Sequence, residues 1–389
     1  MAEKLAQGVT FLHTADLHLG RPFDALSPSA EVRREDLRAT FRRMVERAIQ
    51  EPVDLFLVAG DLFDSPCPPP ADREAARDGF RRLIEAGIHC FAIPGNHDFF
   101  IPGGVWSELE AAGVAVFARP RLELRALPKL GVKVCGMAYD RERPKARPLA
   151  NLVAGDAEPG EWGIFLFHGS LDTIGEGYDD APFSEAEIAR LPFQYVALGH
   201  YHGCREIGRR PLAAYPGSPE GLGMNPRETG ERRFLLGRLE ACEDETAVRL
   251  RKEAASQRRI EIKEIDLSQY SEPESLFDAV RNAAGPDDLL GVRFSGVASP
   301  EVWEAAEELE ERFSGTFFHL RVDRRDAAAP GEIPDDDRFI LGRFCNKLRA
   351  RMQKAHGEER AVLETALRLG LADANRSKSS SPFLPTSVS

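Results

Sequence analysis

Five short motifs in the first half of the chain combine aspartate, asparagine and histidine, residue types that bind divalent metal ions through oxygen and nitrogen. They are Asp16-Leu17-His18, Gly60-Asp61-Leu62-Phe63-Asp64, Gly95-Asn96-His97-Asp98, His168-Gly169 and Gly199-His200-Tyr201-His202. Five of the nine histidines in the chain lie in these motifs. The ordered set predicts a site that holds two metal ions.

The chemistry of such a site follows from its ligand types. Two divalent cations about 3.5 to 4 Å apart can share a hydroxide and stabilise both the attacking and the leaving oxygen of a displacement at phosphorus. An all-cysteine set would indicate structural zinc, whereas carboxylate, amide and imidazole ligands favour manganese, iron or zinc in a more open coordination. The motifs therefore indicate hydrolysis of a phosphate ester.

Each motif follows within four residues of the end of a short apolar segment. These segments are residues 9–12, 54–59, 90–93, 164–167 and 195–198. Such runs are typical of strands that are buried on both faces. Residues 31–50 and 72–85 have apolar side chains at helical spacing and would form the crossover helices. Because ligands gather at the carboxyl ends of strands in α/β folds, we expect the five motifs to meet there.

The motif order D-x-H, G-D-x-x-D, G-N-H-D, H-G and G-H-x-H is similar to that of the calcineurin-like metallophosphoesterase superfamily. Within it, residues 14–20, residues 60–64 with Pro66, and residues 197–202 resemble the SbcD-type DNA repair exonucleases. Residues 215–221, followed by Glu228-Thr229-Gly230, most resemble the YhaO-like branch. The resemblance covers residues 9–240. It implies an α/β fold in which a calcineurin-like β-sandwich is flanked by helices.

The resemblance also implies a role for each residue of the site. Asp16, His18 and His202 would hold one divalent cation, Asn96, His168 and His200 would hold the other, and Asp61 would bridge both, since a carboxylate has two oxygens. Manganese is the expected metal, with iron or zinc as alternatives. His97 would stabilise the transition state or protonate the leaving oxygen, and Asp64 would orient His97.

Three further positions have two interpretations each. Asp98 would either accept a hydrogen bond behind the ligands or shape its own turn. The turn at Tyr215 to Ser218 would either close over the site through backbone contacts or be a plain β-turn. His13 alternates with apolar residues, which favours a histidine in the core or behind the ligands over a metal ligand.

Composition limits the class of protein. A length of 389 residues predicts two or three domains, and 42% hydrophobic residues are enough for sizeable cores. No apolar stretch approaches the ~18 residues of a membrane span, and the first residues lack the pattern of a signal peptide. The six cysteines have neither disulfide nor zinc spacing. These features predict a cytoplasmic protein without membrane contact.

The net charge of -12 argues against tight binding of DNA by this chain alone, because DNA-binding surfaces are usually basic. Two bound cations would nevertheless make the site locally positive. Arginines near the motifs are candidate DNA contacts, although a solvated surface position is the commoner interpretation of each: Arg21, Arg141, Arg143, Arg147 and Arg205. We therefore expect weak intrinsic DNA binding that a partner supplements.

The remainder of the chain suggests additional modules. Residues 1–240 would form the nuclease domain, 241–257 a charged linker, 258–327 a small α/β domain, 335–375 C-terminal helices and 376–389 a disordered tail. A Ser271-x-x-Glu274 capping box predicts where the first helix of the small domain begins. By resemblance, the small domain would cap the site and present DNA. The C-terminal helices would dock onto an SbcC-like, SMC-type ATPase or pack within the chain, and two copies of the chain could form a homodimer.

Together these features predict a manganese-dependent DNA exonuclease and endonuclease of double-strand break repair. Two alternatives remain: a phosphodiesterase or phosphatase for small molecules, and a non-catalytic adaptor of an SMC-like ATPase. The domains beyond the site favour DNA, because a hydrolase of small substrates has no need of them.

Overall fold

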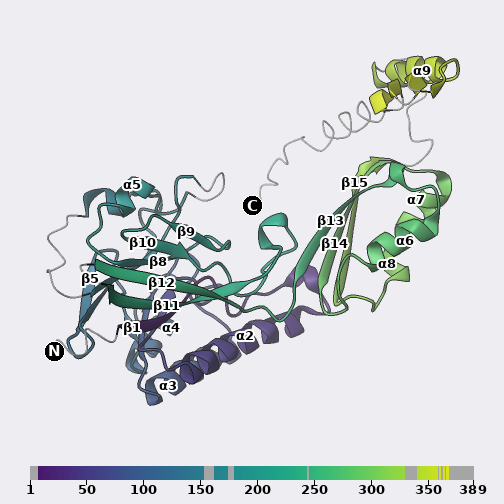
Figure 1. The fold of residues 1–389 in the computed structure, drawn as a ribbon. Helices are drawn as coiled ribbons and strands as arrows, with labels where there is room; N and C mark the ends of the chain where they lie inside the picture. The colour runs from purple at the N-terminus through teal and green to yellow at the C-terminus, as the bar shows by residue number, and fades with distance from the viewer. Residues whose placement is uncertain are drawn as a thin grey trace, which may run out of the picture. The chain divides into compact units, whose positions relative to one another are not determined.

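The fold was obtained as a computed structural model, which describes residues 8–152, 162–173, 179–242, 245–328, 340–357, 359–360, 362–363 and 365–367. The chain divides into two compact units, Met1–Arg259 and Ile260–Ser389 (Figure 1). The five metal-binding motifs all belong to the first unit.

The first unit contains a six-stranded sheet with the order β12-β11-β1-β2-β3-β4. Its strands are β1 (Val9–Thr14), β2 (Leu55–Ala59), β3 (His89–Ile93), β4 (Ala115–Val116), β11 (Arg233–Cys242) and β12 (Glu245–Ala254). Strands β1 to β4 are parallel, and β11 and β12 add an antiparallel edge. The parallel strands are connected by α2 (Ala30–Gln50), α3 (Pro70–Glu85) and α4 (Val105–Ala111). Parallel neighbours require such crossover helices.

The second sheet of this unit has the order β5-β6-β7-β8-β10-β9. Its strands are β5 (Glu123–Leu127), β6 (Val132–Met137), β7 (Trp162–His168), β8 (Tyr195–Gly199), β9 (Arg205–Ile207) and β10 (Leu212–Tyr215). Strands β6, β7, β8 and β10 are parallel to one another. Their carboxyl ends therefore lie along one edge, as they do in the first sheet.

The two sheets pack face to face around one apolar core. Leu57 and Ile93 of the first sheet share this core with Ile164, Leu166 and other buried residues of the second. Helices α2 and α3 cover the outer face of the first sheet, where the rings of Phe41, Phe56 and Phe80 contact one another. Burial of each such ring stabilises the fold by roughly 1.5–3 kcal/mol. The predicted sandwich flanked by helices is confirmed.

The five predicted strands are confirmed as β1, β2, β3, β7 and β8. All five are almost entirely buried, which explains their nearly continuous apolar sequence. Each metal-binding motif begins at, or within three residues of, the carboxyl end of its strand. The fold therefore brings loops from two facing sheets to one place.

The linker expected at residues 241–257 is wrong for most of its length. Residues 245–254 form β12, which pairs with β11 from Cys242 and Glu245 to Arg233 and Ala254. An edge strand needs to bury only one face, and here Val248 and Leu250 pack against the core between charged neighbours. The many charged residues of this segment, which suggested a linker, lie instead on the exposed face of an edge strand.

The second unit has the β-α-β-α-β order that its sequence pattern predicts. Its elements are β13 (Ile260–Asp266), α6 (Pro273–Arg281), β14 (Leu289–Val297), α7 (Pro300–Glu307), α8 (Leu309–Arg312) and β15 (His319–Ala328). The three strands are parallel in the order β13-β14-β15 and share a core with the helices. The capping box predicted from Ser271 is wrong, because α6 begins at Pro273 and Glu272 is its N-cap residue. Proline is favoured at the first helical position.

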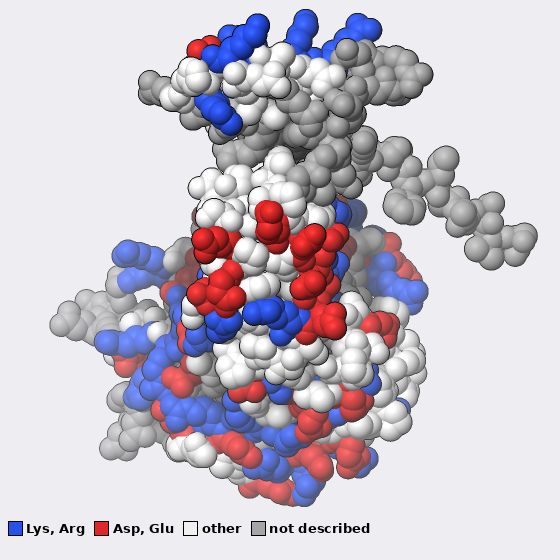
Figure 2. All heavy atoms as spheres, turned by 90° about the vertical axis from the view of Figure 1, so that its right-hand side faces the viewer, with Lys and Arg blue, Asp and Glu red and all other residues white. Residues whose placement is uncertain are grey.

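One face of this unit carries many carboxylates. Figure 2 shows acidic side chains gathered on it, and α7 and α8 contribute exposed glutamates. These are Glu301, Glu304 and Glu307 of α7 and Glu310 and Glu311 of α8, and Glu308 lies between the two helices. These carboxylates give this face a local excess of negative charge.

At the carboxyl end, α9 (Ile340–Met352) lies within the predicted helical region. Residues 359–360, 362–363 and 365–367 are also helical. The predicted disordered tail, 376–389, lies outside the described residues. Within the described part of the chain, no helix combines the length and apolar character needed to cross a membrane.

The close packing between β11 and β1 can be tested at Gly237. A Cβ atom at this position would lie 2.0 Å from the Phe11 ring. We expect Gly237→Ala to lower the free energy of unfolding in urea by about 1–3 kcal/mol, the usual cost of overpacking a core. Arg249→Ala, at an exposed position of the same hairpin, should stay close to wild type. Equal stability of both variants would contradict this packing.

Candidate metal centre

The seven predicted metal ligands lie together at the carboxyl ends of both sheets. Donor atoms of Asp16, His18 and His202 are all within 4.8 Å of one another, and so are those of Asp16, Asp61 and His168. The Asn96 amide Oδ1 is 2.9 Å from His168 Nε2 and 3.1 Å from His200 Nδ1. The ligands therefore form two groups, one around Asp16 and one around Asn96, with Asp61 beside both.

Four of these residues have a backbone conformation that is uncommon for residues other than glycine. The φ angles are positive at Asp16 (54°), His18 (50°), Asp61 (49°) and His200 (100°). Such strain costs on the order of 1–3 kcal/mol per residue and gathers at functional sites. Backbone hydrogen bonds between the first two motifs maintain this conformation. The Asp16 N–H donates to the Gly60 carbonyl, and the His18 N–H donates to the Asp61 carbonyl.

Asp61 has the central position. Its Oδ2 lies 3.6 Å from His18 Nε2 and 3.5 Å from His168 Nε2, and its Oδ1 accepts a hydrogen bond from the His97 backbone N–H. Burial alone would raise the pKa of Asp61, but the adjacent His168 and His18 outweigh it and lower that pKa. Asp61 is therefore a buried, ionised carboxylate that faces both ligand groups.

The donor atoms fit divalent cations. His18 Nε2 is buried and has no hydrogen-bond partner among the described residues, which is the state expected of a nitrogen that binds a metal. His168 Nδ1 donates to the Ala59 carbonyl, so its Nε2 is directed toward Asn96 and Asp61. Burial lowers the pKa of His168, but the charge of Asp61 prevails and raises it to about 9. Without a cation, a proton on His168 would supply the missing positive charge.

His97 is the exposed member of the cluster. Its ring lies edge-on to the His18 ring, with centroids 4.6 Å apart. A ring nitrogen of His97, a ring nitrogen of His18 and a carboxylate oxygen of Asp61 also lie within 4.8 Å of one another. The expected hydrogen bond between Asp64 and His97 is not found among the described residues. Asp64 Oδ1 instead accepts hydrogen bonds from His18 Nδ1 and Arg21 Nη1, each 3.0 Å long. Asp64 is thus placed to orient His18.

The structure resolves the two interpretations of Asp98, because this residue does both things. The buried carboxylate accepts from Gly95 N–H within its own turn and from Phe63 N–H in the second motif. Burial and the charge of Asp61 raise the pKa of Asp98 to about 8. Asp98 therefore joins two of the loops that carry ligands.

The structure also decides between the two interpretations of the turn at residues 215–218 and of His13. The turn at residues 215–218 packs against the fifth motif through its backbone: the Ser218 N–H donates to the His202 carbonyl. The Tyr215 hydroxyl donates to the Gly169 carbonyl. His13 is a core histidine that hydrogen-bonds with the Tyr195 hydroxyl, and burial lowers its pKa to about 3.

The five arginines predicted to contact DNA all have partners within the protein. Arg147 donates to Asp172 and Glu187, Arg143 donates to Asp140, and Arg205 lies 3.8 Å from Glu185. The Arg141 guanidinium stacks 4.2 Å from the centre of the Phe99 ring. Arg21 donates to Asp64 and to the Leu222 carbonyl. Their role in DNA binding stays a prediction.

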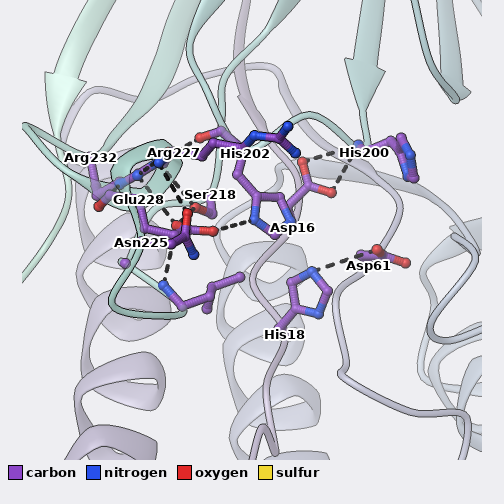
Figure 3. A network of polar contacts seen from close by, with 12 residues as sticks. Asp16, His18, Asp61, His200, His202, Ser218, Asn225, Arg227, Glu228 and Arg232 are labelled. Atoms are coloured by element: carbon purple, nitrogen blue, oxygen red, sulfur yellow. Dashed lines mark hydrogen bonds and ion pairs between the residues drawn. The ribbon is translucent and has the colours of Figure 1, made fainter. Parts of the chain in front are cut away.

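Glu228 is a functional candidate that the motif pattern did not reveal. Its buried Oε1 accepts a hydrogen bond of 2.6 Å from His202 Nδ1 (Figure 3). The sequence shows this residue only as the first member of a Glu-Thr-Gly segment. Nothing in the local pattern of a loop glutamate 26 residues after His202 predicts this contact.

A family model described as calcineurin-like phosphoesterase matches residues 9–204. The chain belongs to this family, whose members bind two divalent metals. Among curated proteins, the chain is 31% identical over 238 residues to the uncharacterized metallophosphoesterase YhaO of Bacillus subtilis, with 59% of this chain and 57% of that protein covered.

Two further relatives carry names from DNA metabolism. The DNA double-strand break repair protein Mre11 of Saccharolobus solfataricus is 30% identical over 202 residues, which cover 50% of this chain and 49% of that protein. The SbcD component of the nuclease SbcCD of Escherichia coli is 26% identical over 275 residues, which cover 60% and 67%. The chain spans about half the length of the first curated relatives it matches, 57% and 49% of the two.

The role of Asp98 can be tested by substitution. Asp98→Ala leaves the N–H groups of Phe63 and Gly95 without their acceptor, and each loss costs about 1–3 kcal/mol. We expect a lower free energy of unfolding in urea and a lower manganese content after equilibrium dialysis. Asp78→Ala, on the exposed face of α3, is the control. A variant with wild-type stability and metal content would show that Asp98 does not hold these loops.

Proposed function

We propose that this chain is a manganese-dependent DNA nuclease of double-strand break repair, an exonuclease on duplex ends with endonuclease activity on single strands. The observation that carries the proposal is the complete set of two ligand groups on either side of the ionised Asp61. Relatives named as a break-repair protein and as part of a nuclease support DNA as the substrate.

In this proposal, Asp16, His18 and His202 would hold one cation, Asn96, His168 and His200 would hold the other, and Asp61 would serve both. Bound divalent cations would activate the attacking water and neutralise charge on the phosphate. Ligands of carboxylate, amide and imidazole type suit manganese, with iron or zinc as alternatives.

His97 is the residue proposed to donate a proton to the leaving oxygen. Its side chain is exposed, so that a phosphodiester could reach it. Its backbone N–H is held by Asp61 Oδ1, which fixes the position of the residue relative to the ligands. The imidazole of histidine suits proton transfer near neutral pH.

A partner is part of the proposal because the protein's own charge does not favour DNA. The net charge is -12, and the exposed glutamates of α7 and α8 make one face of the small domain acidic. On α9, the exposed residues Arg343, Phe344, Lys347 and Arg351 offer both apolar and basic contacts. We propose that this helix docks onto an SMC-type ATPase, which supplies much of the DNA-binding surface, and that the nuclease works as a homodimer.

Degradation of end-labelled duplex DNA in the presence of manganese tests the activity. His97→Ala should keep its manganese content but lose about 100- to 10,000-fold in rate, because a general acid contributes that much. Asp61→Ala should lose both metal and activity. Arg81→Ala, on the exposed side of α3, should behave as wild type.

A small phosphodiester, bis(p-nitrophenyl) phosphate, separates the alternatives. If the wild-type protein cleaves this compound but leaves DNA intact, with and without an SMC-type ATPase, the nuclease proposal fails in favour of a small-molecule phosphodiesterase. If it cleaves neither but binds the ATPase, the chain is an adaptor.

A further inference from the structure

Behind one of the two ligand groups lies a continuous chain of hydrogen bonds. It runs from His202 through Glu228, Leu222, Arg21 and Asp64 to His18. We call this chain the brace. It connects two ligands that are 184 positions apart in the sequence.

The first half of the brace supports His202. Glu228 closes the short 3-10 helix η4 (Pro226–Glu228), whose start is capped by the Asn225 side chain. Glu228 Oε1 accepts from His202 Nδ1 (Figure 3). Glu228 Oε2 accepts from the Leu222 N–H at 3.2 Å. Arg232 Nη2 is 3.3 Å from Glu228 Oε2, and its positive charge balances the negative charge of this buried carboxylate. Donation from Nδ1 leaves the Nε2 lone pair of His202 for a metal.

The second half supports His18 in the same way. His18 Nδ1 donates to Asp64 Oδ1, which leaves the buried Nε2 free to bind a metal. Arg21 holds Asp64 through Nη1 and donates from Nε to the Leu222 carbonyl at 2.9 Å. Leu222 thus meets Glu228 with its N–H and Arg21 with its carbonyl.

His168, in the other ligand group, is oriented without the brace. Its Nδ1 donates to the Ala59 carbonyl at the end of β2, which belongs to the sheet itself. A change in Glu228 therefore removes support from His202 and leaves the hydrogen bond that orients His168 in place.

We propose that Glu228 is a positioning residue that, joined to Asp64 through Leu222 and Arg21, holds His202 and His18 in the orientation that binds one metal ion. Its loss weakens the metal position of Asp16, His18 and His202 selectively. This inference rests on the proposed two-metal site and adds that its two metal positions are supported differently. A histidine of one position is oriented by a loop, and a histidine of the other is oriented by the end of a strand.

Titration of the apoprotein with manganese chloride in a calorimeter tests this directly, without DNA. Wild-type protein should bind two ions. Glu228→Gln keeps the shape of the side chain but removes its charge, so the affinity for one ion should fall about 10- to 100-fold, the usual effect of losing such a partner. The affinity for the other ion should be unchanged.

Glu231→Gln is the matched control, since it removes a charge from an exposed glutamate of the same loop that pairs with Arg233. It should bind both ions as wild type does. Arg21→Gln provides an independent variant if Glu228→Gln does not fold. The Arg21 guanidinium donates to Asp64 and to the Leu222 carbonyl, and its backbone bond to the His18 carbonyl is kept in the variant, so the change should weaken the same ion through the brace alone. Unfolding midpoints of the apoproteins verify that each variant is folded.

Equal weakening of both ions in a folded Glu228→Gln protein would overturn the inference, because the brace would then be a general support of the loop. Unchanged binding of both ions would overturn it as well. The proposed nuclease is judged separately: a wild-type protein that binds two ions but cleaves no DNA loses its proposed function and leaves the brace intact.

Discussion

Asp16 and Asp61 are buried close together where the two sheets meet, and each disfavours the ionised form of the other. Burial and this repulsion raise the pKa of Asp16, whereas neighbouring histidines lower the pKa of Asp61. Hydrogen-bond donors directed at both carboxylates offset this repulsion. Asp16 accepts from the His200 N–H, and Asp61 accepts from the His97 N–H. Much of the surrounding architecture provides the rigidity that this concentration of charge requires.

That rigidity comes from the sandwich. Loops that leave β1 and β2 are hydrogen-bonded to each other, and Asp98 ties the loop after β3 to the second motif. Residues with strained backbone, such as His18 and His200, persist only where the surrounding contacts overdetermine them. Two sheets with a shared core can supply such contacts, whereas a single loop could not.

The sequence revealed the parts of the site that are encoded locally. Runs of buried apolar residues predict β1, β2, β3, β7 and β8, and the motifs that follow them predict where ligands meet. The missed features depend on pairing between distant segments. β12 resembles a linker because only one of its faces is buried. The Asp64 carboxylate turns toward His18 and not His97, and the Glu228 contact is formed by a loop that carries no motif of its own.

Leu222 takes part in the brace through its main chain alone, with its N–H to Glu228 and its carbonyl to Arg21. The identity of its side chain is therefore of little consequence for these two bonds. Any residue that tolerates the same backbone conformation and burial would preserve the connection, and only proline would remove it in part, because proline has no N–H to donate. Because Leu222 is buried, its side chain is constrained by packing and not by the metal support, although its main chain joins the two halves of that support.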